Sequence, residues 1–258
     1  MKKYALDLIV AAVETPREGY VLLRLTHEQA LPPMLPGQFV EVQVRGSETT
    51  FLRRPISINY VDRANNELWL LVHVVGEGTR AMAALKAGDV LNCVFPLGNG
   101  FTQPEGSGRK VLLVGGGVGT APLLYHGEML REAGHEPVFL LGGRTEADLM
   151  QLEHFRRYGR VLLTTEDGSA GTKGFVTHHP VWEDEQFDLI ATCGPKPMMV
   201  AVARMAKAKG TECEVSLENL MACGLGACLC CVEKTHEGNV CVCKDGPVFN
   251  IKQLTWQI

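Results

Sequence analysis

Six of the nine cysteines in this 258-residue chain lie in one stretch near its C-terminal end, and this stretch constrains the fold most. Three of these six cysteines follow the pattern C-x4-C-x2-C: Cys223, Cys228 and Cys231. Gly224 and Gly226 lie between the first two, and glycine permits tight backbone turns and close approach to a bulky group. The segment is therefore expected to fold around a metal centre that its thiolates bind.

Three arrangements fit these cysteines. The spacing C-x4-C-x2-C with a fourth cysteine further on is the ligand order of plant-type [2Fe–2S] clusters. Zinc is an alternative, because Cys228 and Cys231 with Cys241 and Cys243 would make a four-thiolate set. Disulfides are the third alternative, but they persist mainly in secreted proteins, and nothing marks this chain as secreted. The spacing favours the iron–sulfur cluster.

Composition bounds the class of protein. The length and a hydrophobic content of 46% suffice for two domains of ordinary size. A net charge of −4 gives no electrostatic support for nucleic-acid binding, and no apolar run is long enough to span a bilayer. Asp7 interrupts the apolar N-terminal run Tyr4–Val13, which favours a first strand over a signal peptide. Nine cysteines without such a signal predict a reducing, cytoplasmic location.

Residues 1–101 are expected to form an antiparallel β-barrel. Short β-rich runs recur there between turn-forming residues, a spacing typical of small barrels or sandwiches. These runs are Tyr4–Val13, Tyr20–Leu25, Gln38–Val44, Ile56–Tyr60, Leu68–Val75 and Val90–Val94. One helix is predicted over Thr79–Leu85.

Two motifs in this predicted barrel suit a phosphate group. Arg54 begins the strand-like segment Arg54–Ser57, and its planar guanidinium can bind a phosphate through two hydrogen bonds. Gly76–Thr79 begins the predicted helix, where free N–H groups attract an anion. Taken alone, the first motif is more simply explained as a solvated pair of adjacent arginines, and the second as an ordinary capped helix. Their occurrence in one barrel favours a phosphate-bearing ligand.

Residues 110–210 are expected to form an α/β domain with a parallel sheet. The strand Lys110–Val114 leads into Gly115–Pro122 and then a helix through Arg131, the order of a phosphate-binding unit. The glycine spacing differs from G-x-G-x-x-G, and a glycine turn without a ligand is the alternative. Further strands and helices alternate: strands Pro137–Leu141, Val161–Thr165 and Phe187–Thr192, and helices Glu146–Tyr158 and Lys196–Lys209.

Cys193–Pro195 follows a predicted strand at the sheet edge where α/β proteins bind ligands, although a buried structural thiol is the simpler interpretation of Cys193. Residues 102–110 are predicted to be a linker. Residues 211–258 are too few for a core of their own, so the metal centre is expected to order them, with a hairpin at Val240–Ile251. The predicted fold is thus α+β and multidomain: 1–101, 110–210 and 211–258.

The order of these motifs resembles the ferredoxin–NADP reductase superfamily. Its two flavin motifs match Arg54–Ser57 and Gly76–Thr79, and its nicotinamide-domain motifs match Gly115–Pro122 and Cys193–Pro195. The ending Val242–Phe249 and the cysteine spacing resemble one group within this superfamily, the electron-transfer subunits of type B dihydroorotate dehydrogenases.

The resemblance implies three groups of contact residues and no catalytic residue in this chain. For FAD they are Arg54, Pro55, Ile56, Ser57, Leu71, Val72, His73, Gly78 and Thr79. For NAD they are Gly115, Gly116, Gly117, Gly119, Thr120, Cys193, Gly194 and Pro195. The implied cluster ligands are Cys223, Cys228, Cys231 and Cys243, which leaves Cys230 and Cys241 as spare thiols. Alternation cannot choose between Cys241 and Cys243, because residues i and i+2 of a strand face the same side.

The resemblance also implies a function. NADH would deliver a hydride to FAD, and single electrons would pass through the [2Fe–2S] cluster to FMN in a catalytic partner. That partner would oxidise dihydroorotate to orotate in pyrimidine biosynthesis, in a heterotetramer with two copies of each chain. One alternative is the flavin/iron–sulfur subunit of a ferredoxin:NADP oxidoreductase or sulfide dehydrogenase. Another is a zinc-stabilised nucleotide-binding module without redox turnover. NADH over NADPH follows the resemblance, although Arg144 could meet a 2′-phosphate.

Overall fold

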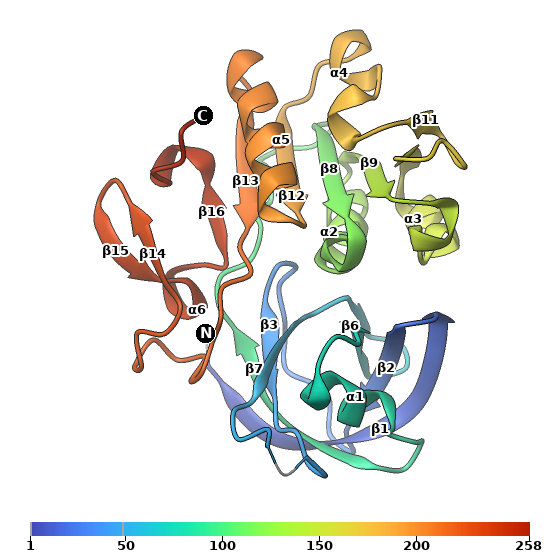
Figure 1. Cartoon of the computed structure of the whole chain (residues 1–258), viewed down its shortest axis with the longest axis vertical. Coiled ribbons are helices and arrows are strands. Elements are labelled where there is room, and N and C mark those ends of the chain that lie inside the picture. Colours follow the sequence, from blue (N-terminus) through green and yellow to red (C-terminus); the bar gives the residue numbers. More distant parts are fainter. Residues whose placement is uncertain (1, 48) are drawn as a thin grey trace. The chain divides into compact units, whose positions relative to one another are not determined.

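The computed structural model describes residues 2–47 and 49–258, and the chain forms two compact units (Figure 1). The units interleave along the sequence. The first contains the chain up to Gly100, Glu218–Glu233 and Asn239–Pro247. The second contains Phe101–Leu217, Lys234–Gly238 and Val248–Ile258. The division into domains 1–101, 110–210 and 211–258 stays a prediction.

The first unit is built on a seven-stranded antiparallel sheet with the order β4-β3-β7-β1-β2-β6-β5. Its strands are β1 (Tyr4–Arg17), β2 (Tyr20–Thr26), β3 (Phe39–Val42), β4 (Arg54–Ser57), β5 (Tyr60–Asp62), β6 (Glu67–His73) and β7 (Val90–Leu97). Strand β1 pairs with β2 and with β7, and its register with β2 shifts twice. Such bulges increase strand twist and bend the sheet, which favours the half-barrel form that this sheet takes.

Alternating apolar side chains fill the half-barrel. Leu8, Leu23, Leu25 and Leu70 are fully buried, and each buried leucine stabilises the fold by about 1.5–3 kcal/mol. The helix α1 (Glu77–Ala83) lies close to its predicted position. The single strand predicted over Ile56–Tyr60 is instead two strands, β4 and β5. The chain changes partner between them, because the Ile58 N–H donates to Gln38 O and the Asn59 N–H donates to Trp69 O.

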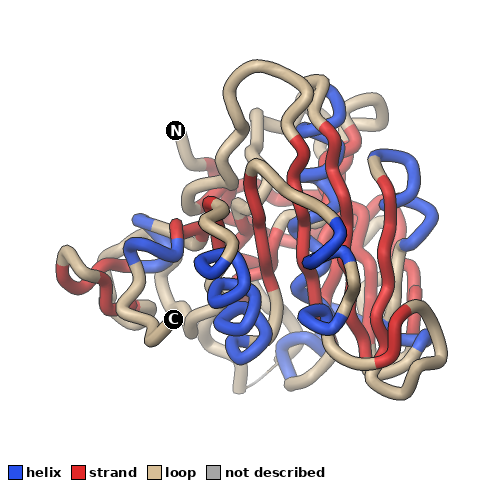
Figure 2. Tube along the Cα trace, turned by 90° about the horizontal axis from the view of Figure 1, so that it is seen from above, coloured by secondary structure: helices blue, strands red, loops and turns tan. Residues whose placement is uncertain are grey.

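The second unit is an α/β unit with the sheet order β11-β10-β9-β8-β12-β13-β16. The strands are β8 (Lys110–Gly116), β9 (Glu136–Gly143), β10 (Arg160–Thr165), β11 (Thr172–Lys173), β12 (Leu189–Cys193), β13 (Glu212–Ser216) and β16 (Val248–Asn250). All neighbouring strands are parallel except β16, which runs antiparallel to β13. Figure 2 shows these strands side by side, with helices alongside. The expected parallel sheet is therefore confirmed.

The helices of this unit connect its parallel strands. They are α2 (Ala121–Glu132), α3 (Leu152–Tyr158), α4 (Val181–Asp184) and α5 (Lys196–Ala208). The central strands are apolar on both faces, as a sheet covered by helices requires, and Leu112, Phe139 and Ile190 are at most 1% exposed. Short 3-10 turns add η1 (Gly117–Thr120), η2 (Glu146–Asp148), η3 (Val176–His178) and η4 (Ile251–Gln253).

Two predicted elements are wrong. The helix predicted over Glu146–Tyr158 is η2 followed by α3, because Gln151 between them takes a left-handed backbone with φ 57°. The hairpin predicted over Val240–Ile251 does not form. Instead β15 (Gly238–Cys241) pairs with β14 (Val232–Thr235), the chain turns through α6 (Val242–Asp245), and β16 joins β13. Each half of this apolar run thus has a different partner.

Candidate functional site

The segment that carries the six clustered cysteines, the cysteine loop, folds back on itself within the first unit. Backbone N–H groups point at three of its sulfur atoms. Leu225 N–H donates to Cys223 Sγ at 3.3 Å, Gly226 N–H to Cys243 Sγ at 3.1 Å, and Cys243 N–H to Cys231 Sγ at 3.4 Å. Amide donors of this kind surround thiolates that hold iron–sulfur clusters and help to set their potentials.

Three positive φ angles produce these turns. Gly224 and Gly226 have φ of 66° and 80°, where a side chain would strain the backbone. Leu229 also has a positive φ, of 59°, which is uncommon for a residue other than glycine, and its side chain is 65% exposed. The glycines therefore have the conformational role that the sequence predicts for them.

The surroundings of the loop shift the pKa values of two of its thiols in opposite directions. Burial acts to raise the pKa of Cys223, but hydrogen bonds from the Leu225, Cys228 and Ala227 N–H groups outweigh it and lower that pKa to about 6. Burial and the neighbouring Cys231 raise the pKa of Cys243 to about 12. The folded loop by itself therefore favours the thiolate at Cys223, whereas Cys243 would lose its proton only to a bound cation.

The structure separates the two candidates for the fourth ligand. They do not share a strand, as the sequence implied, because Cys241 ends β15 and Cys243 lies in α6. Their sulfur atoms also contact different backbone groups of Gly226: Cys243 Sγ accepts from the Gly226 N–H, whereas Cys241 Sγ donates to the Gly226 carbonyl at 3.9 Å. A metal-bound thiolate needs donors and has no proton to give, which favours Cys243.

No three His, Cys, Asp or Glu side chains of the described residues are placed to hold one metal ion. In a two-iron cluster each iron takes only two protein ligands, so a ligand set spread over two irons remains compatible with this geometry. All nine cysteines are free thiols, and Cys228 and Cys230 are exposed. The assignment of Cys223, Cys228, Cys231 and Cys243 as ligands stays a prediction.

The two predicted flavin motifs meet in the first unit. A Cβ atom at Gly78, in α1, would lie 3.2 Å from Nε of Arg54, so the arginine packs directly over the glycine. The Arg54 guanidinium donates to Leu52 O at 2.9 Å, and Ser57 lies at the other end of the same strand, β4. The hydroxyl of Thr79 is used within its own turn, where it accepts from the Gly76 N–H at 3.0 Å. The two predicted flavin motifs therefore lie within contact distance of each other.

The other predicted flavin residues lie on neighbouring strands of the same sheet. Pro55 and Ile56 are half-buried in β4, and Leu71 and Val72 lie in the barrel core, 2% and 1% exposed. His73 ends β6 and stacks on Tyr20 with ring centroids 4.4 Å apart. This stacking supports the interpretation of His73 as a strand histidine without a catalytic role.

The two predicted NAD motifs also touch each other, within the second unit. Gly115 and Gly116 end β8, and Gly117, with φ 58°, begins η1, which leads to Thr120 and α2. A Cβ atom at Gly119 would lie 2.5 Å from both Cα and N of Gly194.

Cys193 and Pro195 flank that contact. Cys193 is fully buried at the end of β12, beside Gly115 of β8, which supports its interpretation as a structural thiol. Pro195 precedes α5. Both NAD motifs therefore lie at the C-terminal ends of adjacent parallel strands, where ligands bind in such sheets.

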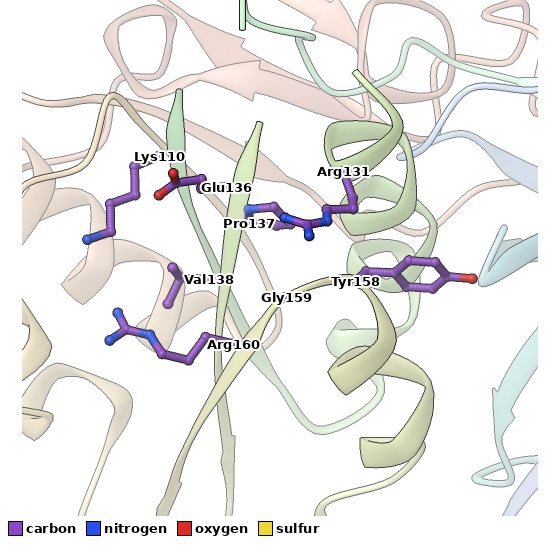
Figure 3. A pocket seen from close by; sticks show the side chains of 8 residues that line it. All are labelled: Lys110, Arg131, Glu136, Pro137, Val138, Tyr158, Gly159 and Arg160. Atoms are coloured by element: carbon purple, nitrogen blue, oxygen red, sulfur yellow. The ribbon is translucent and has the colours of Figure 1, made fainter. Parts of the chain in front are cut away.

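A cavity of about 340 Å³ lies at the opposite edge of the same sheet (Figure 3). It is lined by Lys110, Arg131, Glu136, Pro137, Val138, Tyr158, Gly159 and Arg160, at the N-terminal ends of β8, β9 and β10. Glu185 pairs with Lys110 and, at 2.6 Å, with Arg160, which neutralises two of its cations. This cavity is distinct from the predicted nucleotide site.

Comparison with known proteins agrees with the motifs. Residues 218–255 match the family model of the iron–sulfur cluster binding domain of dihydroorotate dehydrogenase B. The chain is 38% identical over 98% of its length, and 98% of the relative, to the dihydroorotate dehydrogenase B (NAD(+)) electron transfer subunit of Shouchella clausii. It is 42% identical to the Caldanaerobacter subterraneus protein of the same name, over 83% of the chain and 84% of that protein. The chain belongs to this family of electron transfer subunits.

Structural neighbours show the same fold. An NADH-dependent reduced ferredoxin-NADP oxidoreductase, studied for flavin-based electron bifurcation, superposes with a TM-score of 0.87 at 31% identity, over 99% of this chain and 92% of that one. The ferredoxin reductase of carbazole 1,9a-dioxygenase shares the fold at 20% identity, with a TM-score of 0.68 over 82% of this chain and 67% of that one.

Family membership confirms the expected fold class and the expected electron-transfer function. It also confirms the expected cofactors, which are FAD, NAD(H) and a [2Fe–2S] cluster. Within residues 2–47 and 49–258, none of the helices has the length and apolar character that crossing a bilayer requires.

Proposed function

We propose that this chain carries electrons between NAD(H) and the FMN of a dihydroorotate dehydrogenase catalytic subunit. The observation that carries the proposal is that one compact unit holds both the flavin motifs and the cysteine loop. A flavin accepts a hydride and releases electrons one at a time, which is the conversion that such a chain must provide. The dihydroorotate site belongs to the partner chain, in a cytoplasmic heterotetramer of two copies of each.

Each motif has a defined task in this proposal. Arg54 neutralises the pyrophosphate of FAD, and the absence of a side chain at Gly78 leaves room for the guanidinium. The η1 turn presents backbone N–H groups to the pyrophosphate of NAD(H), next to the Gly194 backbone. Four thiolates hold the cluster: Cys223, Cys228, Cys231 and Cys243.

The cysteine loop also offers a surface for the partner. Leu220, Leu225 and Leu229 are 86%, 47% and 65% exposed, and Cys228 is exposed among them. Exposed apolar side chains grouped on one loop mark interaction sites, because water solvates them poorly. A partner that covers these leucines would bring its own cofactor next to the cluster ligand Cys228.

A second candidate function is favoured by a specific observation. The structural neighbour with a TM-score of 0.87 is an NADH-dependent ferredoxin-NADP oxidoreductase. Its 31% identity is below the 38–42% of the dihydroorotate dehydrogenase relatives, which favours the first candidate.

Reconstitution tests the proposal and separates the candidates. The chain, purified without oxygen, is expected to show flavin bands and a broad brown absorption. Mixed with an FMN-containing dihydroorotate dehydrogenase catalytic subunit, it should make NAD⁺ reduction depend on dihydroorotate. Reduction of NADP⁺ by ferredoxin instead would support the second candidate. A colourless protein that contains zinc would contradict both.

A further inference from the structure

Glu41 is a buried acidic residue that the sequence gives no reason to single out. It lies in β3 and has no exposed surface. Neither of its carboxyl oxygens has a hydrogen-bond partner among the described residues. Burying an unpaired, ionised carboxylate destabilises the fold by several kcal/mol, so the presence of Glu41 in the interior needs an explanation.

The surroundings of Glu41 connect the flavin strand to the cysteine loop. In the sheet, Glu41 is paired directly with Pro55 of β4, the strand that carries the predicted flavin contacts. On its side-chain face, Glu41 packs against Gly224, the residue that follows the first predicted cluster ligand. A Cβ atom at Gly224 would lie 2.6 Å from Cγ of Glu41 and 3.1 Å from Oε1.

The nearest cation does not bind the Glu41 carboxyl. The Arg53 guanidinium donates to the Glu41 backbone O at 3.2 Å and to Asn92 Oδ1 at 2.5 Å. Burial raises the pKa of Glu41 to about 7, although Arg53 acts against that rise. The carboxyl therefore has no hydrogen-bond partner among the described residues, and the side chain packs against Gly224 over its length.

We propose that Glu41 is a positioning residue that holds the Cys223–Gly224 turn at a fixed place against the flavin-binding strand β4. The inference rests on the proposed function, and it goes further by assigning the side of the cluster that faces the flavin strand to Cys223. Electrons that leave the flavin would then reach the cluster on this side, and the exposed Cys228 would lie on the side that is open to a partner. No bond is made or broken at Glu41.

Length and charge can be separated by two conservative variants. Glu41→Gln keeps the length and removes the charge, whereas Glu41→Asp keeps the charge and shortens the side chain by one methylene. Positioning by shape predicts that Glu41→Gln behaves as the wild type. It also predicts that Glu41→Asp transfers electrons from NADH through the cluster about tenfold more slowly. The shorter side chain would let the Cys223–Gly224 turn shift by ~1 Å, and a shift of that size can lower a rate tenfold or more.

The assay compares two activities of the iron-loaded, FAD-loaded protein. NADH oxidation by an artificial acceptor at the flavin should be equal in all variants. NADH oxidation through the cluster to the FMN-containing partner should fall in Glu41→Asp alone. Electron paramagnetic resonance of the dithionite-reduced cluster should show altered g values in the same variant. Glu67→Asp is the matched control for the shortening, because Glu67 is also a buried barrel carboxyl but pairs with Arg24 at 2.8 Å, and it should leave electron passage through the cluster unchanged.

Two results would overturn the proposal. Glu41→Asp with wild-type spectra and wild-type activity through the cluster would show that the length of the side chain is irrelevant. Impairment of Glu41→Gln with normal Glu41→Asp would show that charge, and not shape, is what the site uses. Failure of the proposed function is distinguishable, because the wild-type protein itself would then pass no electrons to the partner.

Discussion

The contact between Gly119 and Gly194 makes a quantitative prediction about the nucleotide site. Gly119→Ala would place a Cβ atom 2.5 Å from Gly194 Cα, whereas an ordinary contact is 3.4–4 Å. The two loops would therefore have to separate by about 1 Å, and a misplacement of that size can cost about a hundredfold in rate. The backbone of Gly119 has no positive φ, so crowding is the effect that the substitution introduces.

The assay is the rate at which NADH reduces the bound flavin, followed by its absorbance after rapid mixing. We expect a loss of about a hundredfold in Gly119→Ala, while dithionite still reduces the flavin. Overpacking should also lower the free energy of unfolding of the second unit by about 1–3 kcal/mol.

A control must lose similar stability without touching either loop. Gly210, which follows α5, has φ 67° and open space around its Cβ position, so Gly210→Ala costs about 1–2 kcal/mol through backbone strain alone. This variant should keep the wild-type rate of flavin reduction by NADH. A wild-type rate in Gly119→Ala, or an equal loss in Gly210→Ala, would refute the assignment of these loops to NAD(H).

Three further outcomes are expected. Arg54→Ala should weaken FAD binding by about 1.5–3 kcal/mol, measured as flavin lost on gel filtration, and undiminished flavin content would contradict the assignment. Cys243→Ser should lose the brown chromophore and Cys241→Ser should keep it; the reverse result in iron analysis would make Cys241 the fourth ligand. Burial lowers the pKa of His126 from 6.5 to about 3, so below pH 6.5 the unfolded chain binds a proton that the folded unit excludes. This lowers the stability of the second unit by about 2 kcal/mol at pH 5, and His126→Gln should remove that part of the pH dependence in amide hydrogen exchange of β8.

Local patterns predicted most of the fold. The β-rich run Tyr20–Leu25 and the apolar run Lys110–Val114 became β2 and β8, because each run finds its partners in neighbouring strands of one sheet. The same reasoning from local patterns gave the wrong prediction of a hairpin over Val240–Ile251. Its apolar residues fit a hairpin, but β15 and β16 pair with different strands, and no periodicity records which partner a strand takes.

The packing of Glu41 was likewise beyond the sequence. Val40 and Val42 face the barrel interior, so alternation places Glu41 on the outer face, where a carboxylate is normally solvated. The cysteine loop covers that face from a position far along the chain, and only the folded structure shows the contact. The glycine contact between Gly119 and Gly194 has the same long-range origin, although both glycines were predicted site residues.

From the connectivity of the C-terminal segment we expect that loss of the cluster leaves the predicted nucleotide site intact. The segment leaves the second unit at the end of β13, returns to it briefly at Lys234–Gly238 and again as β16, and β13 and β16 are hydrogen-bonded neighbours. Val215 pairs with Phe249 there, and both are buried. The ends of the long loop are therefore joined by the sheet itself, and the metal centre has to order only its interior. A thiolate substitution consequently acts on the loop and on electron passage through it, while the sheet that carries the NAD motifs keeps its own core.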